Sequence, residues 1–206
     1  MLSKKARECA DHIKKYTSAL VVSHIDADGL ASAAIMGKAL ERAGIDRRTI
    51  FVKQLDLKNL QDIASQNPEL VIFTDLGSGM LDPIKSLKLN AVIADHHQPQ
   101  GNYGFHLNPH IFGINGGIEV SGSGMAYFIA REMDGNGDLA ALAIVGAVGD
   151  LQHSKHGQLI GLNRTILDEG VKNKVIKYEK DLMYSEGRHA PYLSSFSIQP
   201  ISIFRA

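Results

Sequence analysis

The chain has 206 residues, of which 44% are hydrophobic and 21% are charged, as is ordinary for a soluble globular protein. Its 22 basic and 22 acidic residues cancel, so no overall positive field indicates nucleic-acid binding, although a local basic groove remains compatible with this balance. A single cysteine, Cys9, cannot form an internal disulfide. Because no apolar run reaches the length of a membrane span and no signal peptide is recognisable, we expect a cytoplasmic protein without a membrane partner.

The first half of the sequence predicts short strands that alternate with helices. Strands are expected where β-branched and other apolar residues follow one another, at 19–23, 50–55, 70–74 and 91–94. Helices are expected where apolar residues recur every three or four positions, at 3–16, 30–43, 57–66 and 81–87. This alternation is typical of right-handed βαβ units. We therefore predict an α/β fold, a mostly parallel sheet with helices on both faces.

The second half is richer in glycine, asparagine and serine. A strand is expected at 103–107, and helices are expected at 124–133, 139–148, 158–171 and 174–183. From Gly187 onward the composition is that of a linker or tail. We therefore predict one domain over residues 1–186, followed by a linker or tail over 187–206.

One stretch of the sequence is more informative than any other. The apolar strand that ends near Val22 is followed by His24, Asp26 and Asp28, and then by Gly29 and a helix. Open α/β sheets bind their ligands at the carboxyl ends of the strands. Carboxylates in such a cluster repel one another unless a cation binds them. The stretch therefore predicts a metal site.

Further charged side chains follow two other predicted strands and one predicted helix. They are Asp75 after the third strand, Asp95, His96 and His97 after the fourth, and Asp150 after the helix at 139–148. Because parallel strands share one carboxyl edge, we expect these side chains to converge with the first cluster.

The candidate ligands predict two metal ions. Mixed imidazole and carboxylate ligands suit Mn²⁺, with Mg²⁺, Co²⁺ and Zn²⁺ as competitors. The ligands are too many for one ion, and two ions about 3.5–4 Å apart that share a carboxylate would use them all. Asp75 follows the strand between the other two clusters and is the natural bridge. Such a pair activates water and neutralises phosphoester oxygens, which predicts phosphoester hydrolysis.

Four motifs, in this order, resemble those of the DHH phosphoesterase superfamily. They are Ser-His-Ile-Asp-Ala-Asp-Gly at 23–29, Thr-Asp-Leu-Gly-Ser-Gly at 74–79, Ala-Asp-His-His at 94–97 and Gly-Ala-Val-Gly-Asp at 146–150. Four spaced motifs are far more specific than the Asp-His-His triplet alone. The resemblance covers residues 23–150.

This resemblance implies a role for each candidate residue. It implies that metal is bound by His24, Asp26, Asp28, Asp75, His96 and Asp150, with Asp75 bridging the ions. It also implies that His97 contacts the scissile phosphate and that Asp95 orients an imidazole, so these two are the candidate catalytic residues. The implied cofactor is Mn²⁺, as two ions, with Mg²⁺ or Co²⁺ as the alternative.

The spelling of the first motif favours one branch of the superfamily. His-Ile-Asp-Ala-Asp-Gly lacks the proline found in pyrophosphatases and nano-RNases, and it is similar to the motif of RecJ-type single-strand exonucleases, archaeal ones above all. The resemblance therefore implies an exonuclease that hydrolyses single-stranded DNA or RNA. Catalytic members also carry a second domain, DHHA1, with a Gly-Gly-Gly-His motif. That motif does not occur in this sequence, and we expect the DHHA1 domain to be absent from it.

Two other functions stay open at this point. One is a phosphatase of small nucleotides or a phosphodiesterase of cyclic dinucleotides, from the same superfamily. The other is a non-catalytic scaffold for replication or repair proteins, since archaeal relatives associate with the replicative helicase. A complete set of ligands argues against a pure scaffold.

Ordinary structural roles also explain some of these residues when each is considered alone. Asp28 is suited to cap the helix that follows it, Asp75 to initiate a turn, and Asp150 to end a helix. The Gly-Ser-Gly at 122–124 either binds phosphate through its N–H groups or simply starts a helix. Weaker candidates for contact with phosphate are His153 and His156, and a run of lysines, Lys172, Lys174, Lys177 and Lys180, for contact with a DNA or RNA backbone. His106 lies in a segment that resembles one near the active site of the family, which implies a functional role for it.

Overall fold

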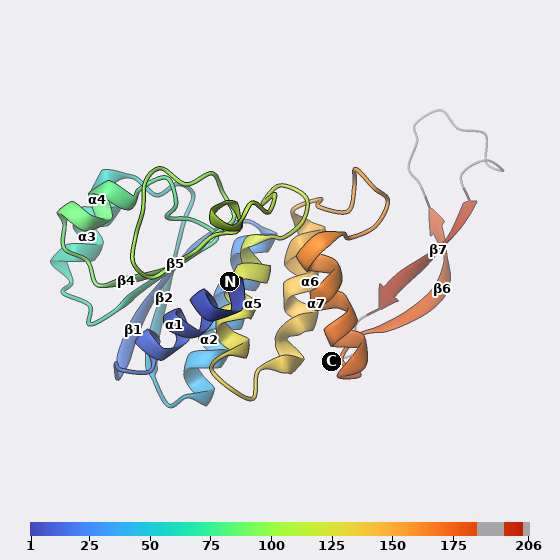
Figure 1. Cartoon of the computed structure of the whole chain (residues 1–206), viewed down its shortest axis with the longest axis horizontal. Helices are drawn as coiled ribbons and strands as arrows, with labels where there is room; N and C mark the ends of the chain where they lie inside the picture. The colour runs from blue at the N-terminus through green and yellow to red at the C-terminus, as the bar shows by residue number, and fades with distance from the viewer. Residues whose placement is uncertain (185–195, 204–206) are drawn as a thin grey trace.

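The protein is built around a five-stranded parallel sheet with the strand order β2-β1-β3-β4-β5 (Figure 1). A computed structural model describes the chain over residues 1–184 and 196–203. The strands are β1 (Ser18–His24), β2 (Asp46–Val52), β3 (Val71–Thr74), β4 (Ala91–Ala94) and β5 (His106–Leu107). The helices are α1 (Leu2–Ile13), α2 (Ala27–Arg42), α3 (Leu57–Ser65), α4 (Leu81–Ser86), α5 (Gly122–Arg131), α6 (Ala140–Gly149) and α7 (Gly161–Lys172).

The sheet is covered on both faces, as the sequence predicted. Alternate residues of each strand point to opposite faces, so that Ile72 packs into one apolar cluster and Phe73 into another. The first cluster is covered by α1, α2 and α5, and the second by α3 and α4, which lie on the other side of the sheet in Figure 1. The α/β prediction is confirmed, and the near-continuous apolar strands reflect burial on both faces.

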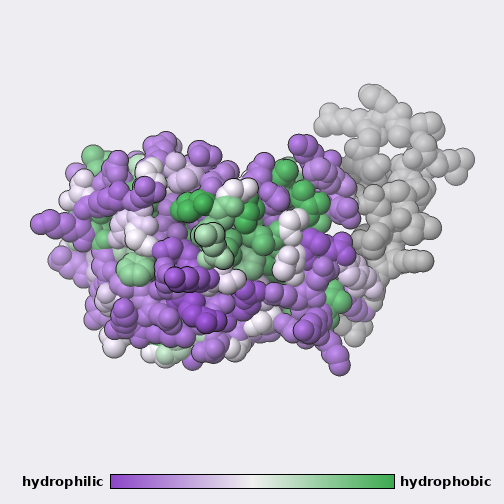
Figure 2. Space-filling view, viewed as in Figure 1, coloured by the Kyte–Doolittle hydropathy of each residue, from purple (hydrophilic) through white to green (hydrophobic). Residues whose placement is uncertain are grey.

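Two further helices extend the larger face into a third layer. Helix α6 packs against α2 and α5, and α7 packs against α6 (Figure 1). The surface of this side is mostly hydrophilic, with one hydrophobic area near the middle of the view (Figure 2). Within the described residues, no helix combines the length and the apolar composition that crossing a bilayer requires.

The start of α2 places its polar residues at the sheet edge. Asp26 is the N-cap, and its Oδ1 accepts a hydrogen bond of 2.9 Å from the N–H of Gly29. A Cβ atom at Gly29 would lie 2.3 Å from the carbonyl oxygen of His24, so only glycine lets the helix begin so close to the end of β1. Asp28, for which capping was the alternative to metal binding, is not the cap but lies in the first turn and is buried.

Two predicted elements differ from the structure. Strand β2 starts at Asp46 rather than at residue 50, because an edge strand tolerates the polar residues 46–49, which hide its pattern. The helix predicted at 174–183 is wrong. Lys174 has a φ of 61°, which ends the helical path, and residues from Lys177 form β6.

Strand β6 (Lys177–Tyr184) pairs antiparallel with β7 (Phe196–Ile203) in a separate two-stranded sheet. The lysine run therefore does not share one helix face, because Lys172 ends α7 whereas Lys177 begins β6. Strand β7 lies in the range predicted as linker or tail, whose remaining residues, 187–195 and 204–206, lie outside the described part. The division at residue 186 stays a prediction.

Candidate metal centre

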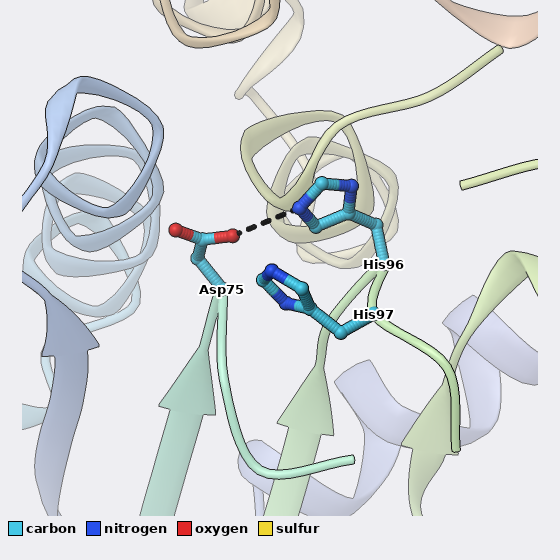
Figure 3. A group of neighbouring side chains, drawn as sticks. All are labelled: Asp75, His96 and His97. Carbon is cyan, nitrogen blue, oxygen red and sulfur yellow. Dashed lines mark ion pairs between the residues drawn. The ribbon is translucent and has the colours of Figure 1, made fainter. Parts of the chain in front are cut away.

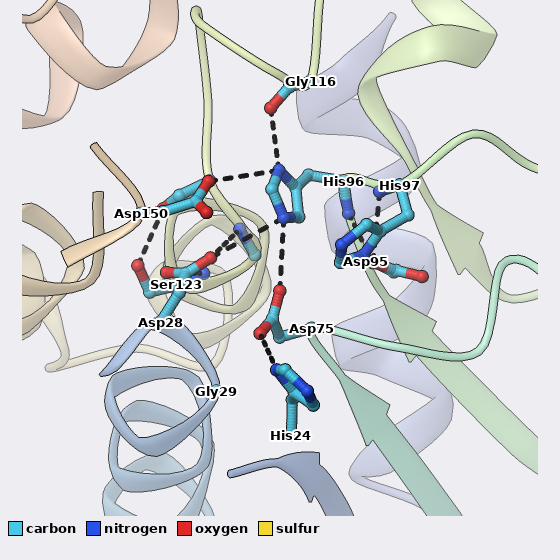
Figure 4. A network of polar contacts seen from close by, with 12 residues as sticks. His24, Asp28, Gly29, Asp75, Asp95, His96, His97, Gly116, Ser123 and Asp150 are labelled. Atoms are coloured by element: carbon cyan, nitrogen blue, oxygen red, sulfur yellow. Dashed lines mark hydrogen bonds and ion pairs between the residues drawn. The ribbon is translucent and has the colours of Figure 1, made fainter. Parts of the chain in front are cut away.

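All six predicted ligands meet at the carboxyl edge of the sheet. Figure 4 shows His24, Asp28, Asp75, His96 and Asp150 together at this edge. Their potential ligand atoms form three groups, and within each group the atoms lie within 4.8 Å of one another. The groups are His24 with Asp26 and Asp75, Asp75 with His96 and His97, and Asp28 with His96 and Asp150. Asp75 is common to two groups and so is His96, which makes these residues the centre of the cluster.

Asp75 is the most constrained member of the cluster. It directly follows β3 with a φ of 58°, a left-handed conformation that is strained for a residue with a side chain. Its carboxylate is 2% exposed and faces the ring of His96, with His97 beside it (Figure 3). Oδ1 lies 3.2 Å from Nε2 of His96 but has no hydrogen bond of good geometry among the described residues. Burial raises the pKa of Asp75 to about 8.

A buried carboxylate oxygen without a hydrogen bond is costly, unless a cation compensates it. The residues at this site therefore fit a divalent metal ion. An oxygen atom of Asp75 is available on the side where imidazole nitrogens and other carboxylates converge. The donor set, imidazole nitrogen together with carboxylate oxygen, suits Mn²⁺, and other divalent metal ions compete for a site of this kind.

His24 directs one ring nitrogen at this centre. Its Nε2 lies 3.1 Å from the carbonyl oxygen of Lys53, which can only accept, so Nε2 carries a proton. Nδ1 then faces Oδ2 of Asp26 at 2.8 Å and Oδ2 of Asp75 at 3.8 Å. A nitrogen held between two carboxylates binds either a proton or a metal ion. The carbonyl of Lys53 thus orients the ring of His24 so that Nδ1 faces the cluster.

His96 is oriented in the same manner from the other side. Its Nδ1 donates to the carbonyl oxygen of Gly116 over 2.7 Å, which leaves Nε2 facing Asp75 and, at 3.9 Å, Asp28. Burial alone would lower the pKa of His96, but the adjacent carboxylate of Asp75 and the charge of Asp28 outweigh it and raise the pKa to about 10. Without a metal ion, the cluster therefore holds protons in the place of the cation.

Asp28 is held by the start of helix α5. Its carboxylate accepts hydrogen bonds from the N–H groups of Gly122, over 2.7 Å, and Ser123, over 3.0 Å. The positive end of the α5 dipole also stabilises this charge. The N–H of Gly124 is used by the hydroxyl of Ser121. The hypothesis that residues 122–124 bind phosphate is therefore wrong, because their donors are already occupied, and the alternative of a helix start is confirmed.

Asp95 holds the ring of His97 and belongs to none of the three groups of potential metal ligands in the described chain. Its buried carboxylate accepts from the N–H groups of Ser78, His96 and His97 and, over 2.8 Å, from Nδ1 of His97. Burial alone would raise the pKa of Asp95, but the hydrogen bond and charge of His97 outweigh it and hold the pKa well below its usual range. The same bond is the main reason why the pKa of His97 is raised. Nε2 of His97 stays free on a ring that is 59% exposed.

Asp150 caps the C-terminal end of α6 and depends on a residue that the sequence did not indicate. Its Oδ2 accepts a hydrogen bond of 2.9 Å from Nε2 of Gln152. Gln152 is 1% exposed, donates also to the carbonyl of Gly116 and accepts from Asn163. It thereby joins Asp150 to the carbonyl that orients His96. Burial raises the pKa of Asp150. No motif or periodicity singled out Gln152, because its role arises only from long-range contacts.

His106 supports the site from behind. It is 1% exposed, and its Nε2 lies 2.9 Å from Oγ of Ser78, whose N–H binds Asp95. Asn108 donates both to this Oγ and to the carbonyl of His97. Burial lowers the pKa of His106 to about 4. His106 is thus a neutral supporting residue, whereas His153 and His156 belong to none of the metal groups in the described ranges.

The pKa of His106 predicts a specific loss of stability in acid. Because the folded pKa, about 4, lies below the ordinary value of 6.5, the unfolded chain binds more protons between these values. The stability contributed by His106 is present above pH 6.5 and is lost as the pH falls towards 4, by at most about 3 kcal/mol. We expect His106→Gln to flatten the pH dependence of urea unfolding in this window. An unchanged slope would contradict the assignment.

The close approach of α5 to Asp75 predicts that Gly122→Ala weakens metal binding. A Cβ atom at position 122 would lie 2.4 Å from Oδ1 of Asp75, so the carboxylate must move. We expect the affinity for Mn²⁺, measured by calorimetry, to fall at least about tenfold, as other changes around metal ligands do. The control is Gly104→Ala, where a Cβ atom meets nothing within 4 Å. Equal affinities of both variants would contradict the prediction.

Comparisons with known proteins identify the family of the chain. The family model described as DHH family, N-terminal domain, matches residues 18–147. An uncharacterised protein of Methanocaldococcus jannaschii is 38% identical over 174 residues, which cover 80% of this chain and 39% of that protein. The chain therefore spans about two fifths of the curated relative that it matches.

Solved structures of RecJ share the fold. Exonuclease RecJ bound to manganese matches with a TM-score of 0.65 at 19% identity, over 83% of this chain and 47% of that one. RecJ of Thermus thermophilus in complex with Mn²⁺ matches with a TM-score of 0.64 at 20% identity, over 82% of this chain and 27% of that one. At these identities the likeness shows a common fold. Because the family model covers more than half of the sequence, the chain belongs to the DHH family.

Proposed function

We propose that the protein is a metal-dependent phosphodiesterase of the RecJ-like type, which removes nucleotides from single-stranded DNA or RNA. Membership of the DHH family and the RecJ-like fold support a metal-dependent phosphoesterase in general. The observation that carries the proposal is the convergence of six metal-ligand side chains around Asp75. A buried carboxylate oxygen without a hydrogen bond at their centre has a physical explanation if divalent cations bind there.

The grouping of the side chains supports two neighbouring ions. His24, Asp26 and Asp75 would hold one, and Asp28, His96 and Asp150 would hold the other, with Asp75 between them. Bound divalent ions would supply Lewis acidity and an activated water for hydrolysis of a phosphoester. RecJ structures contain manganese, and the mixed donor set here suits the same ion, so we propose Mn²⁺ with Mg²⁺ as the alternative.

The residues outside the ligand set would act on the phosphate. Asp95 fixes the ring of His97 through Nδ1 and raises its pKa, which favours the charged imidazole with a proton on the exposed Nε2. A protonated imidazole beside the cluster suits contact with a non-bridging phosphate oxygen. Asp95 is thus a positioning residue, whereas His97 is the proposed catalytic residue.

The candidate metal centre also helps to judge the two alternative functions, the scaffold and the phosphatase or phosphodiesterase of small nucleotides. A scaffold would have no need of the complete ligand set, whose charges cost stability unless ions bind them. A phosphatase of small nucleotides or of cyclic dinucleotides would use the same centre. The first motif, His-Ile-Asp-Ala-Asp-Gly, lacks the proline of pyrophosphatases and nano-RNases, which favours single-stranded nucleic acid over small substrates.

The proposal predicts that Asp75→Asn abolishes hydrolysis while it preserves the fold. Asparagine keeps the shape of the side chain and removes a buried charge, so thermal stability should not fall. We expect Mn²⁺-stimulated hydrolysis of a 5′-labelled single-stranded oligonucleotide to decrease more than about 100-fold, since changes next to metal ligands alone cost 10–100-fold. The control is Asp168→Asn, which removes a surface ion pair with Arg164.

The same assay separates the alternatives. Full activity of Asp75→Asn would contradict the proposed centre. Faster hydrolysis of dinucleotides than of long single strands would favour the small-nucleotide alternative. Absence of hydrolysis with Mn²⁺, together with co-purification of replication or repair proteins, would favour the scaffold.

A further inference from the structure

A pocket of about 270 Å³ adjoins the metal centre on the side of α3 and α4. One wall is the loop between β2 and α3, and the opposite wall is the loop between β3 and α4. Its floor includes His24, Asp75, Asp95 and His97. The walls contribute Lys53, Gln54, Leu55, Leu76, Gly77, Gly79 and Met80. The proposed function assigns no role to these wall residues.

The size of the pocket limits what it can hold. Pockets for complete drug-sized ligands usually measure about 300–1,000 Å³, so 270 Å³ is enough for one ring system but not for a dinucleotide. A larger pocket of about 540 Å³ lies at the opposite edge of the sheet, at the first residues of β1 and β2, and contains none of the predicted ligands. Of these two pockets, the smaller one is continuous with the candidate metal centre.

The chemistry of the walls favours a flat apolar group with polar edges. Leu55 and Leu76 are largely buried and Met80 is partly buried, so sugar hydroxyl groups placed between them would lose water without gaining partners. A second phosphate would face the carboxylates of Asp75 and Asp95. A nucleobase meets neither penalty, because its faces are apolar and the thioether of methionine packs well against aromatic rings.

Two exposed polar residues complete the pocket. Lys53 and Gln54 belong to the same wall and are exposed, so their side chains are free to meet the donors and acceptors of a base edge. The backbone carbonyl of Lys53 also orients His24, which ties this wall directly to the metal centre. The same wall therefore borders both the pocket and the candidate metal centre.

We propose that this pocket binds the nucleobase of the nucleotide whose phosphate lies at the metal centre. This inference rests on the proposed function and adds a substrate requirement to it. The protein distinguishes a nucleotide from a sugar phosphate or an inorganic phosphate by the base, through Met80 and the two leucines. Base recognition then belongs to the same domain as the metal ligands.

The test uses substitutions that change the pocket and leave every proposed metal ligand in place. A Cβ atom at Gly79 meets no atom within 4 Å, and the residue does not need a left-handed conformation, so Gly79→Leu should fold. The matched control is Gly104→Leu, where a Cβ atom also meets nothing within 4 Å. A second variant, Met80→Ala, removes the thioether from the same wall.

The measurement is calorimetry of the full chain with Mn²⁺, using adenosine 5′-monophosphate, ribose 5-phosphate and inorganic phosphate. We expect the wild type to bind the nucleotide roughly tenfold more tightly than ribose 5-phosphate, as contacts of a base with methionine and leucine side chains allow. Gly79→Leu and Met80→Ala should lose most of this advantage. Binding of ribose 5-phosphate and inorganic phosphate should not change, and Gly104→Leu should behave as the wild type.

Three outcomes would overturn the inference. They are equal affinities of the wild type for nucleotide and sugar phosphate, an unchanged preference in Gly79→Leu, and an equal loss for all three ligands. A titration of the metal-free protein with adenosine, monitored by the NMR shift of the Met80 methyl group, tests the pocket separately. A shift of this methyl group without any binding of Mn²⁺ would refute the proposed function and leave the base pocket standing. Binding of Mn²⁺ without such a shift would refute the base pocket and leave the proposed function standing.

Discussion

The structure depends on one constraint, the carboxylate of Asp75 held out of water where the carboxyl ends of the strands meet. Its backbone is in a left-handed conformation, its charge is desolvated, and one oxygen has no good hydrogen bond among the described residues. Each of these features costs stability. Helix α5 packs closely against this side chain, since a Cβ atom at Gly122 would lie 2.4 Å from Oδ1 of Asp75.

The surrounding carboxylates each accept hydrogen bonds from backbone N–H groups of the fold. Asp28 accepts from the first N–H groups of α5, Asp95 accepts from three backbone N–H groups, and Asp26 caps α2. These bonds use some lone pairs of each carboxylate and leave Asp26 and Asp28 able to act as ligands. The fold therefore assembles a cluster of negative charge that only a cation completes.

The two central histidines follow the same principle. In each, a backbone carbonyl accepts a hydrogen bond from one ring nitrogen and so directs the other nitrogen inward. The carbonyl belongs to Lys53 for His24 and to Gly116 for His96. Gln152 extends this arrangement to Asp150. The carbonyl of Lys53 belongs to the same loop that forms a wall of the neighbouring pocket, so ligand orientation and the proposed recognition of a base depend on one segment.

The sequence by itself determined the parallel sheet and the convergence of His24, Asp75 and His96, because apolar strands and their polar ends are local patterns and parallel strands share one edge. It did not determine β6, where the spacing of lysines imitates a helix, nor the occupied N–H groups at 122–124. Gln152, the pocket beside the metal centre and the pairing of Asp95 with His97 rather than His96 were decided by the tertiary structure alone. Each depends on how side chains and distant segments pack together, which no local pattern records.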